Sequence, residues 1–109
     1  MTDIVTLCTL FADLEVTEVE RWIGEAWVLP ENAGGTYVFH EVDIARVRLI
    51  VELRHDMAID DEAMPVVLNL LDQVYALRRR LKQVTAALDT LPPDLRTAIA
   101  ARLGEAKGE

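Results

Sequence analysis

Residues 17–39 of this chain read TEVERWIGEAWVLPENAGGTYVF, and this stretch decides the fold. Thr17 and Glu20 have the spacing of a capping box, in which each side chain bonds the backbone N–H of the other residue. Apolar residues then recur at helical spacing. We therefore expect a helix from about Glu18 to Glu25.

The second half of the stretch predicts a β-hairpin. Residues 27–30 and 36–39 are rich in aromatic and β-branched side chains, and turn formers that include Gly34 and Gly35 separate them. Two short strands joined by a Gly-Gly turn would form a small wing beside the helix.

Helices are expected on both sides of this stretch. Before it, the apolar segment 7–14 predicts a first helix. After it, His40 can cap a helix whose N-terminal dipole Glu41 and Asp43 would stabilise, and which would end near residues 55–57. The apolar face of that helix comprises Ile44, Val47, Leu49, Ile50, Val51 and Leu53. Its solvated positions comprise Arg46, Arg48, Glu52 and Arg54.

A long helix should follow. The acids at residues 60–62 fit the start of a helix better than a metal site. Consecutive acids at a helix start usually cap it and interact favourably with its dipole. Pro65 would fall in the first turn. A heptad pattern then predicts a coiled coil that joins two copies in a homodimer, since a lone helix would expose several large apolar side chains. The a and d positions of this seam are Val67, Leu70, Val74, Leu77, Leu81, Val84 and Leu88.

Leu91-Pro92-Pro93 should stop the long helix, and a short amphipathic helix should cover residues 95–103. The expected organisation is a helix-and-wing part over residues 1–57, a dimerisation helix over 58–90, and a short C-terminal helix and tail over 91–109.

Composition limits the class of protein. With 109 residues, half of them apolar, the chain suits one mainly α-helical domain with an extended arm. Its one cysteine, Cys8, excludes an internal disulfide and is expected to be a buried, inert side chain. Neither a signal peptide nor a membrane-spanning stretch is predicted, so we expect a cytoplasmic protein.

No catalytic site is predicted. His40 and His55 fall in different elements, and neither has a cysteine or a second histidine at a ligand spacing. Gly34-Gly35 precedes a strand rather than a helix, so it does not fit a phosphate-binding loop. We expect a protein that is not an enzyme and holds no cofactor or metal.

Two other features have a structural and a functional interpretation. Trp22 and Trp27 should mainly fill the core, but one ring left partly exposed would be a typical anchor for a protein partner. The run Arg78-Arg79-Arg80 with Lys82 could touch nucleic acid, although beside a heptad seam such residues usually solubilise a coil and direct its pairing.

The order of these elements resembles the MerR-like winged helix-turn-helix architecture over about residues 5–90. Within it, residues 37–56, YVFHEVDIARVRLIVELRHD, and residues 66–74, VVLNLLDQV, are similar to the chaperone-modulator CbpM family. That resemblance implies a modulator that binds the J-domain of a DnaJ-like co-chaperone of the CbpA type. It also implies inhibition of that co-chaperone's stimulation of Hsp70 and of its DNA binding. The J-domain would present the basic helix that docks on Hsp70.

The charge of the first 43 residues agrees with a protein partner. They contain nine acids and one base, Arg21, whereas residues 44–109 contain ten acids and ten bases. DNA-binding proteins supply Lys and Arg to phosphates, so this acidic segment would repel a duplex. The residues that we expect to meet the J-domain are Glu15, Glu18, Glu20, Trp22, Glu25, Trp27, Glu31 and Glu41.

Two other functions stay open from the sequence. One is a dimeric, MerR-like DNA-binding transcriptional regulator, in which the arginines of the coil would compensate for the acids. The other is a structural subunit held through the coil.

Overall fold

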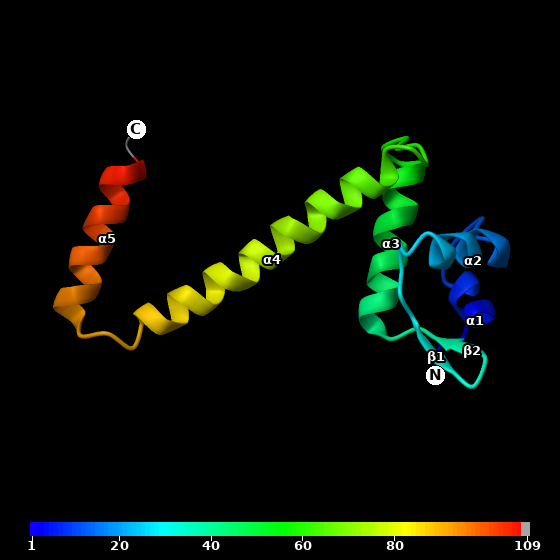
Figure 1. The fold of residues 1–109 in the computed structure, drawn as a ribbon, viewed down its shortest axis with the longest axis horizontal. Coiled ribbons are helices and arrows are strands. Elements are labelled where there is room, and N and C mark those ends of the chain that lie inside the picture. Colours follow the sequence, from blue (N-terminus) through cyan, green and yellow to red (C-terminus); the bar gives the residue numbers. More distant parts are fainter. Residues whose placement is uncertain (108–109) are drawn as a thin grey trace. The chain divides into compact units, whose positions relative to one another are not determined.

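The computed structural model describes the backbone of residues 1–107 and the side chains of residues 1–104 (Figure 1). The elements in chain order are α1 (Ile4–Thr9), α2 (Val16–Gly24), β1 (Glu31–Ala33), β2 (Thr36–Val38), α3 (Glu41–His55), α4 (Met64–Leu88) and α5 (Pro93–Lys107). The chain divides between Leu68 and Asn69 into two compact units. We call the N-terminal unit, Met1–Leu68, the head.

The first helix lies earlier in the chain than the predicted segment 7–14. Asp3 is its N-cap, and the Asp3 carboxylate accepts a hydrogen bond from the Thr6 backbone N–H at 2.8 Å. That bond holds the pKa of Asp3 below its usual value. The helix ends at Thr9, so the prediction placed it too late because the capping signal at Asp3 was overlooked. Leu7 on the helix and Leu14 after it are both buried.

The second helix begins two residues before its predicted start. Its N-cap is Glu15, which forms a capping box with Glu18; the Glu15 N–H donates to Glu18 Oε1 at 3.4 Å. The predicted box between Thr17 and Glu20 was therefore wrong. Both pairs have the same spacing, and both place Val19 on the buried face, so periodicity alone does not separate them.

The wing is shorter than predicted. β1 pairs antiparallel with β2, with Asn32 opposite Tyr37, and Gly34 and Gly35 adopt the positive φ angles of the turn. The Asn32 side chain accepts a hydrogen bond from the Gly35 N–H at 3.0 Å, which closes the turn.

The predicted strand over residues 27–30 is absent from the described structure, because this segment ends α2 instead of pairing with β2. After Ala26, which has a φ of 60°, the Trp27 N–H donates to the Trp22 carbonyl at 2.9 Å. Trp27 and Val28 are both buried in the core.

The third helix begins where it was predicted. His40 is its N-cap, and the His40 N–H donates to Asp43 Oδ2 at 2.8 Å. Val47, Ile50 and Leu53 are buried, as the predicted apolar face requires.

Two arginines of α3 were wrongly expected to be solvated. Arg46 Nε donates to the Trp27 carbonyl at 2.8 Å, in partly buried surroundings. Arg54 is half-buried, and its Nη1 atom lies 3.7 Å from Glu18 Oε2 and 3.6 Å from Asp61 Oδ1. Both side chains join α3 to other segments of the head.

The long helix is present but shorter than the predicted segment 58–90, since it runs from Met64 to Leu88. Asp60 Oδ1 accepts from the Ala63 N–H at 2.8 Å, and Pro65 lies in the first turn. The helix stops at Leu88, before the two prolines. α5 then runs from Pro93 to Lys107 and is longer than predicted, while residues 108–109 of the predicted tail lie outside the described residues.

The hydrophobic core belongs to the head. Every buried apolar side chain among the described residues lies between Leu7 and Leu68, and Trp22 is the largest of those that are fully buried. Met64 and Leu68 bring the first turn of α4 into this core. Burying one such large side chain stabilises a fold by roughly 1.5–3 kcal/mol. The C-terminal unit has no buried side chain among its described residues, so its apolar groups are available to a partner.

Candidate functional site

The glutamates expected to meet a partner lie on the surface of the head. Five of the six are exposed: Glu15, Glu20, Glu25, Glu31 and Glu41. Glu20 lies on α2 and Glu25 is the C-cap of that helix, whereas Glu31 opens β1 and Glu41 opens α3. We refer to these five exposed glutamates together as the acidic surface of the head.

Glu18 has a structural role that the sequence did not predict. It is half-buried, completes the capping box of α2, and approaches the Arg54 guanidinium at 3.7 Å. Replacing Glu18 would therefore disturb the head as well as its charge. The capping role was expected of Glu20, whereas the structure gives it to Glu18.

Both tryptophan rings fill the core, as was mainly expected, and neither is left partly exposed as an anchor for a partner. Trp22 is 1 % exposed and Trp27 is 5 % exposed. The two rings stack with their centroids 6.5 Å apart, and the Arg21 guanidinium lies over the Trp27 ring at 5.8 Å from its centroid. Because Arg21 covers the outer ring, neither indole offers a contact surface in this conformation.

Arg21 is the only base among the first 43 residues, and its charge is already used. Its Nη1 atom lies 2.7 Å from Asp61 Oδ2, across 40 positions of sequence. Asp61 thus joins α2 to the loop before α4, instead of acting only on the α4 dipole as predicted. The base that could have contacted a phosphate is paired with a carboxylate.

The two units carry opposite formal charges. Residues 1–68 contain fourteen acids and four arginines, a net charge of -10 with neutral histidines. Residues 69–109 contain five acids and seven bases, a net charge of +2. The acidity of the whole chain therefore belongs to the head.

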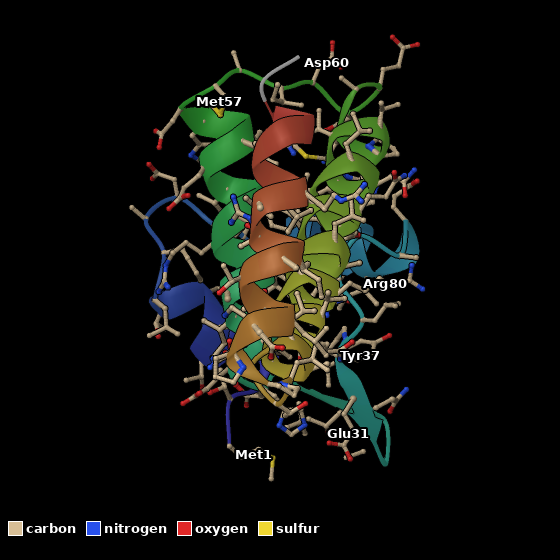
Figure 2. The ribbon with its side chains drawn as sticks, turned by 90° about the vertical axis from the view of Figure 1, so that its left-hand side faces the viewer. Met1, Glu31, Tyr37, Met57, Asp60 and Arg80 are labelled. Atoms are coloured by element: carbon tan, nitrogen blue, oxygen red, sulfur yellow. The ribbon has the colours of Figure 1, made fainter. Side chains whose placement is uncertain are left out.

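The hairpin adds to the acidic surface. Figure 2 shows Glu31 and Tyr37 on the hairpin, and Met57 and Asp60 at the opposite end of α3. Glu31 Oε2 lies 2.8 Å from His40 Nε2, which fixes the hairpin against the start of α3. Neither strand carries a Lys or Arg.

Sequence reasoning also missed two exposed aliphatic side chains of the head, Leu29 and Val42. Both were hidden by secondary-structure expectations, since Leu29 was assigned to a strand and Val42 to the first turn of an amphipathic helix. A count of apolar residues outside the buried face of α3 could have found Val42.

The predicted dimerisation residues are largely exposed in the single chain. Leu70, Val74, Leu77, Leu81 and Val84 are exposed, and Val67 and Leu88 are half-buried. Arg78, Arg79, Arg80 and Lys82 beside them are exposed too, and Arg78 lies over the Tyr75 ring at 6.0 Å from its centroid. An open groove between the end of α4 and α5 is lined by residues that include Leu88, Arg96, Ile99 and Leu103.

Two other kinds of site, a metal-binding cluster and a membrane-spanning helix, are absent from the described part of the chain. In the described part of the chain, no three His, Cys, Asp or Glu side chains are grouped so that they could hold a metal ion. No helix over those residues is both long and apolar enough to span a membrane. Cys8 is half-buried, and burial, with a smaller contribution from the charge of Glu18, raises the pKa of its thiol.

Comparison with known proteins gives the family. The family model described as MerR HTH family regulatory protein matches residues 3–85, which include the head and most of α4. Searches of curated proteins and of solved structures found no match. The matched range and the order of two helices, hairpin, helix and long helix agree with a MerR-like winged helix (Figure 1). The chain therefore belongs to the MerR HTH family of regulatory proteins.

Proposed function

We propose that this chain is a chaperone modulator whose acidic head binds the J-domain of a DnaJ-like co-chaperone of the CbpA type. The observation that carries the proposal is the charge of the surface that helix-turn-helix proteins turn toward DNA. In such proteins the second helix enters the major groove, and basic side chains hold the phosphates. Here α2 exposes Glu20 and has Glu25 as its C-cap, its one arginine is paired with Asp61, and the hairpin begins with Glu31.

The proposed mechanism is occlusion. The basic helix of a J-domain, which docks on Hsp70, would be covered by the acidic head, so the co-chaperone could not stimulate Hsp70 while bound. Because the same basic face would be covered, the co-chaperone would also bind DNA less tightly. Complementary charges mainly raise the association rate and make it sensitive to salt.

The test is a calorimetric titration of the full chain with the isolated J-domain, at low and at physiological salt. Saturable binding that weakens as salt rises is the expected result. Absence of heat at both salt concentrations, with a folded protein, would reject the proposal.

A matched pair of variants tests where the charge acts. Glu20→Lys with Glu25→Lys should weaken J-domain binding and flatten its salt dependence, because both residues lie at the acidic surface. Glu52→Lys with Asp56→Lys makes the same change in net charge at exposed positions near the other end of α3 and serves as the control. Equal losses in the two variants would mean that net charge, not this surface, governs binding.

The family match supports one alternative, a DNA-binding transcriptional regulator. Titration of the same protein with fluorescent duplex DNA distinguishes it. Salt-dependent DNA binding without J-domain binding would replace the proposed function with this one.

We also propose that two copies pair through the seam of α4. Its exposed leucines and valines repeat at heptad spacing, and their burial in a second copy would remove them from water. Sedimentation at several protein concentrations tests this, with a dimer expected and a concentration-independent monomer as the contrary result.

A further inference from the structure

The head exposes two large aliphatic side chains near its hairpin, although its tryptophans are buried. Leu29 is 74 % exposed and Val42 is 73 % exposed. Leu29 lies in the segment between α2 and β1, and Val42 lies in the first turn of α3. A few residues near the centre of an interface usually supply most of its binding free energy, and the core of an interface is more apolar than its rim.

Two contacts place Leu29 beside the turn that carries Val42. Arg46 Nε donates to the Trp27 carbonyl at 2.8 Å, and His40 Nε2 lies 2.8 Å from Glu31 Oε2. Since residue 27 is tied to residue 46 and residue 31 to residue 40, the segment runs antiparallel to the first turns of α3. Leu29, midway along it, is therefore level with residues 42–44. Figure 1 shows this cyan segment, between α2 and β1, running beside α3.

Three exposed acids lie close to this pair along the chain. Glu25 precedes the segment, Glu31 follows it, and Glu41 adjoins Val42 along the chain, and all three are exposed. Arg46 nearby is partly buried and bonded to the Trp27 carbonyl. Two exposed apolar side chains with acids close to them in the chain fit the composition of a protein–protein contact, which has an apolar centre and a polar rim.

We propose that Leu29 and Val42 form the apolar centre of the partner-binding surface, and that its occupant is a basic amphipathic helix of a protein. That helix would place one or two aliphatic side chains on Leu29 and Val42, while its Lys and Arg meet Glu25, Glu31 and Glu41. Nucleic acid does not fit, because the rim repels phosphates and the centre has no aromatic ring on which a base could stack. The inference rests on the proposed function, since it takes the J-domain helix as the occupant.

The experiment compares three full-length proteins for binding to the isolated J-domain: the wild type, Leu29→Ser with Val42→Ser, and Met57→Ser. Met57 is a matched control, because it is 65 % exposed and lies at the far end of α3 (Figure 2). The double variant should weaken binding at least about tenfold, the effect of losing apolar contacts at an interface centre. Met57→Ser should bind like the wild type. The substituted side chains are exposed, so thermal unfolding should be nearly unchanged in all three proteins.

The outcomes separate the two proposals. Wild-type binding that the double variant retains within about twofold would overturn this inference and leave the proposed function intact. Equal losses in the double variant and in Met57→Ser would also overturn it, because the contact would not be local. Failure of the wild type to bind the J-domain would overturn the proposed function and this inference with it.

Discussion

Arg21 and Asp61 are 40 residues apart in the sequence and are joined by an ion pair of 2.7 Å between Arg21 Nη1 and Asp61 Oδ2. The same carboxylate approaches Arg54, whose other acidic neighbour is Glu18. This network connects α2, α3 and the loop before α4. Arg21 is the one basic residue of α2 that could contact a DNA phosphate, and it is already paired with Asp61. The pair joins parts of the head and leaves no positive charge on α2 for DNA.

Loss of Asp61 should destabilise the head slightly. Both partners of the Arg21 pair are substantially exposed, and exposed pairs contribute about 0.2–1 kcal/mol. Asp61→Asn should therefore lower the free energy of unfolding by an amount in that range, as measured by urea denaturation. A double-mutant cycle with Arg21→Gln isolates the pair, and a coupling free energy of zero would contradict it. Glu62→Gln, a change at the adjacent exposed acid, is the control.

The network was beyond prediction because a contact across 40 residues has no local signal. The third helix, by contrast, was predicted correctly at both ends, since its cap at His40 and its apolar period are local features. The start of α2 lay between these cases: two overlapping residue pairs, Glu15 with Glu18 and Thr17 with Glu20, offered equally spaced boxes, and the structure uses the first.

The errors at the candidate site have a different cause. Residues 27–30 have high strand propensity, but propensity does not show that Trp27 is needed to end α2 and fill the core. Trp27 was therefore expected to be available to a partner, while Leu29, two residues on, was overlooked. Burial of one side chain decides the exposure of its neighbours, and only the packed structure provides that information.

Replacing Ala26 by glycine should stabilise the protein. Ala26 follows α2 with a φ of 60°, a left-handed conformation that costs a residue with a Cβ roughly 1–2 kcal/mol and costs glycine little. Because glycine also loses more entropy on folding, we expect a net gain of about 0.5–1 kcal/mol in the free energy of unfolding. Ala45→Gly, at an exposed position inside α3, should instead destabilise by about 1 kcal/mol. Denaturant titration of both variants checks the opposite signs.

Asp3 should make the stability of the head depend on pH in the acid range. The hydrogen bond from the Thr6 backbone N–H lowers the pKa of Asp3 in the folded state, so the ionised carboxylate stabilises the folded state. Its contribution is present above the unfolded pKa of about 4 and is lost as the pH falls through the lower folded value. Asp3→Ala should thus lower the melting temperature at neutral pH and have a smaller effect below about pH 3. An equal effect at all pH values would contradict the role of the ionised carboxylate.

The charges of the two units predict the direction in which two copies pair. In a parallel coil both heads, each with a formal charge of -10, would lie at the same end of the seam. An antiparallel coil separates the heads along α4, by more than the distance of about 8 Å over which salt screens charges. It also brings each acidic head toward the basic C-terminal unit of the second copy.

Arg78 and Arg80 then select the register. An antiparallel seam can pair Leu70 with Leu81 of the second copy, or Val74 with Val84 of the second copy. In the second register, Arg78 of one copy faces Arg80 of the other, so these like charges repel. In the first register, neither arginine faces an arginine of the other copy.

Cysteine crosslinking in a Cys8→Ala background tests this register. A mixture of the Leu70→Cys and Leu81→Cys chains, refolded together, should form disulfide-linked dimers, because paired seam positions lie within reach of an S–S bond. Each of these chains alone should not, since a homodisulfide needs a parallel seam.

A mixture of Val74→Cys and Val84→Cys chains should crosslink poorly until Arg78→Gln and Arg80→Gln remove the repulsion, with yield then rising about fivefold, as expected for relief of two like-charge contacts. Arg79→Gln, on the side of α4 away from the seam, should leave that yield unchanged. Homodisulfides from single-cysteine chains would show instead that the two acidic heads lie together.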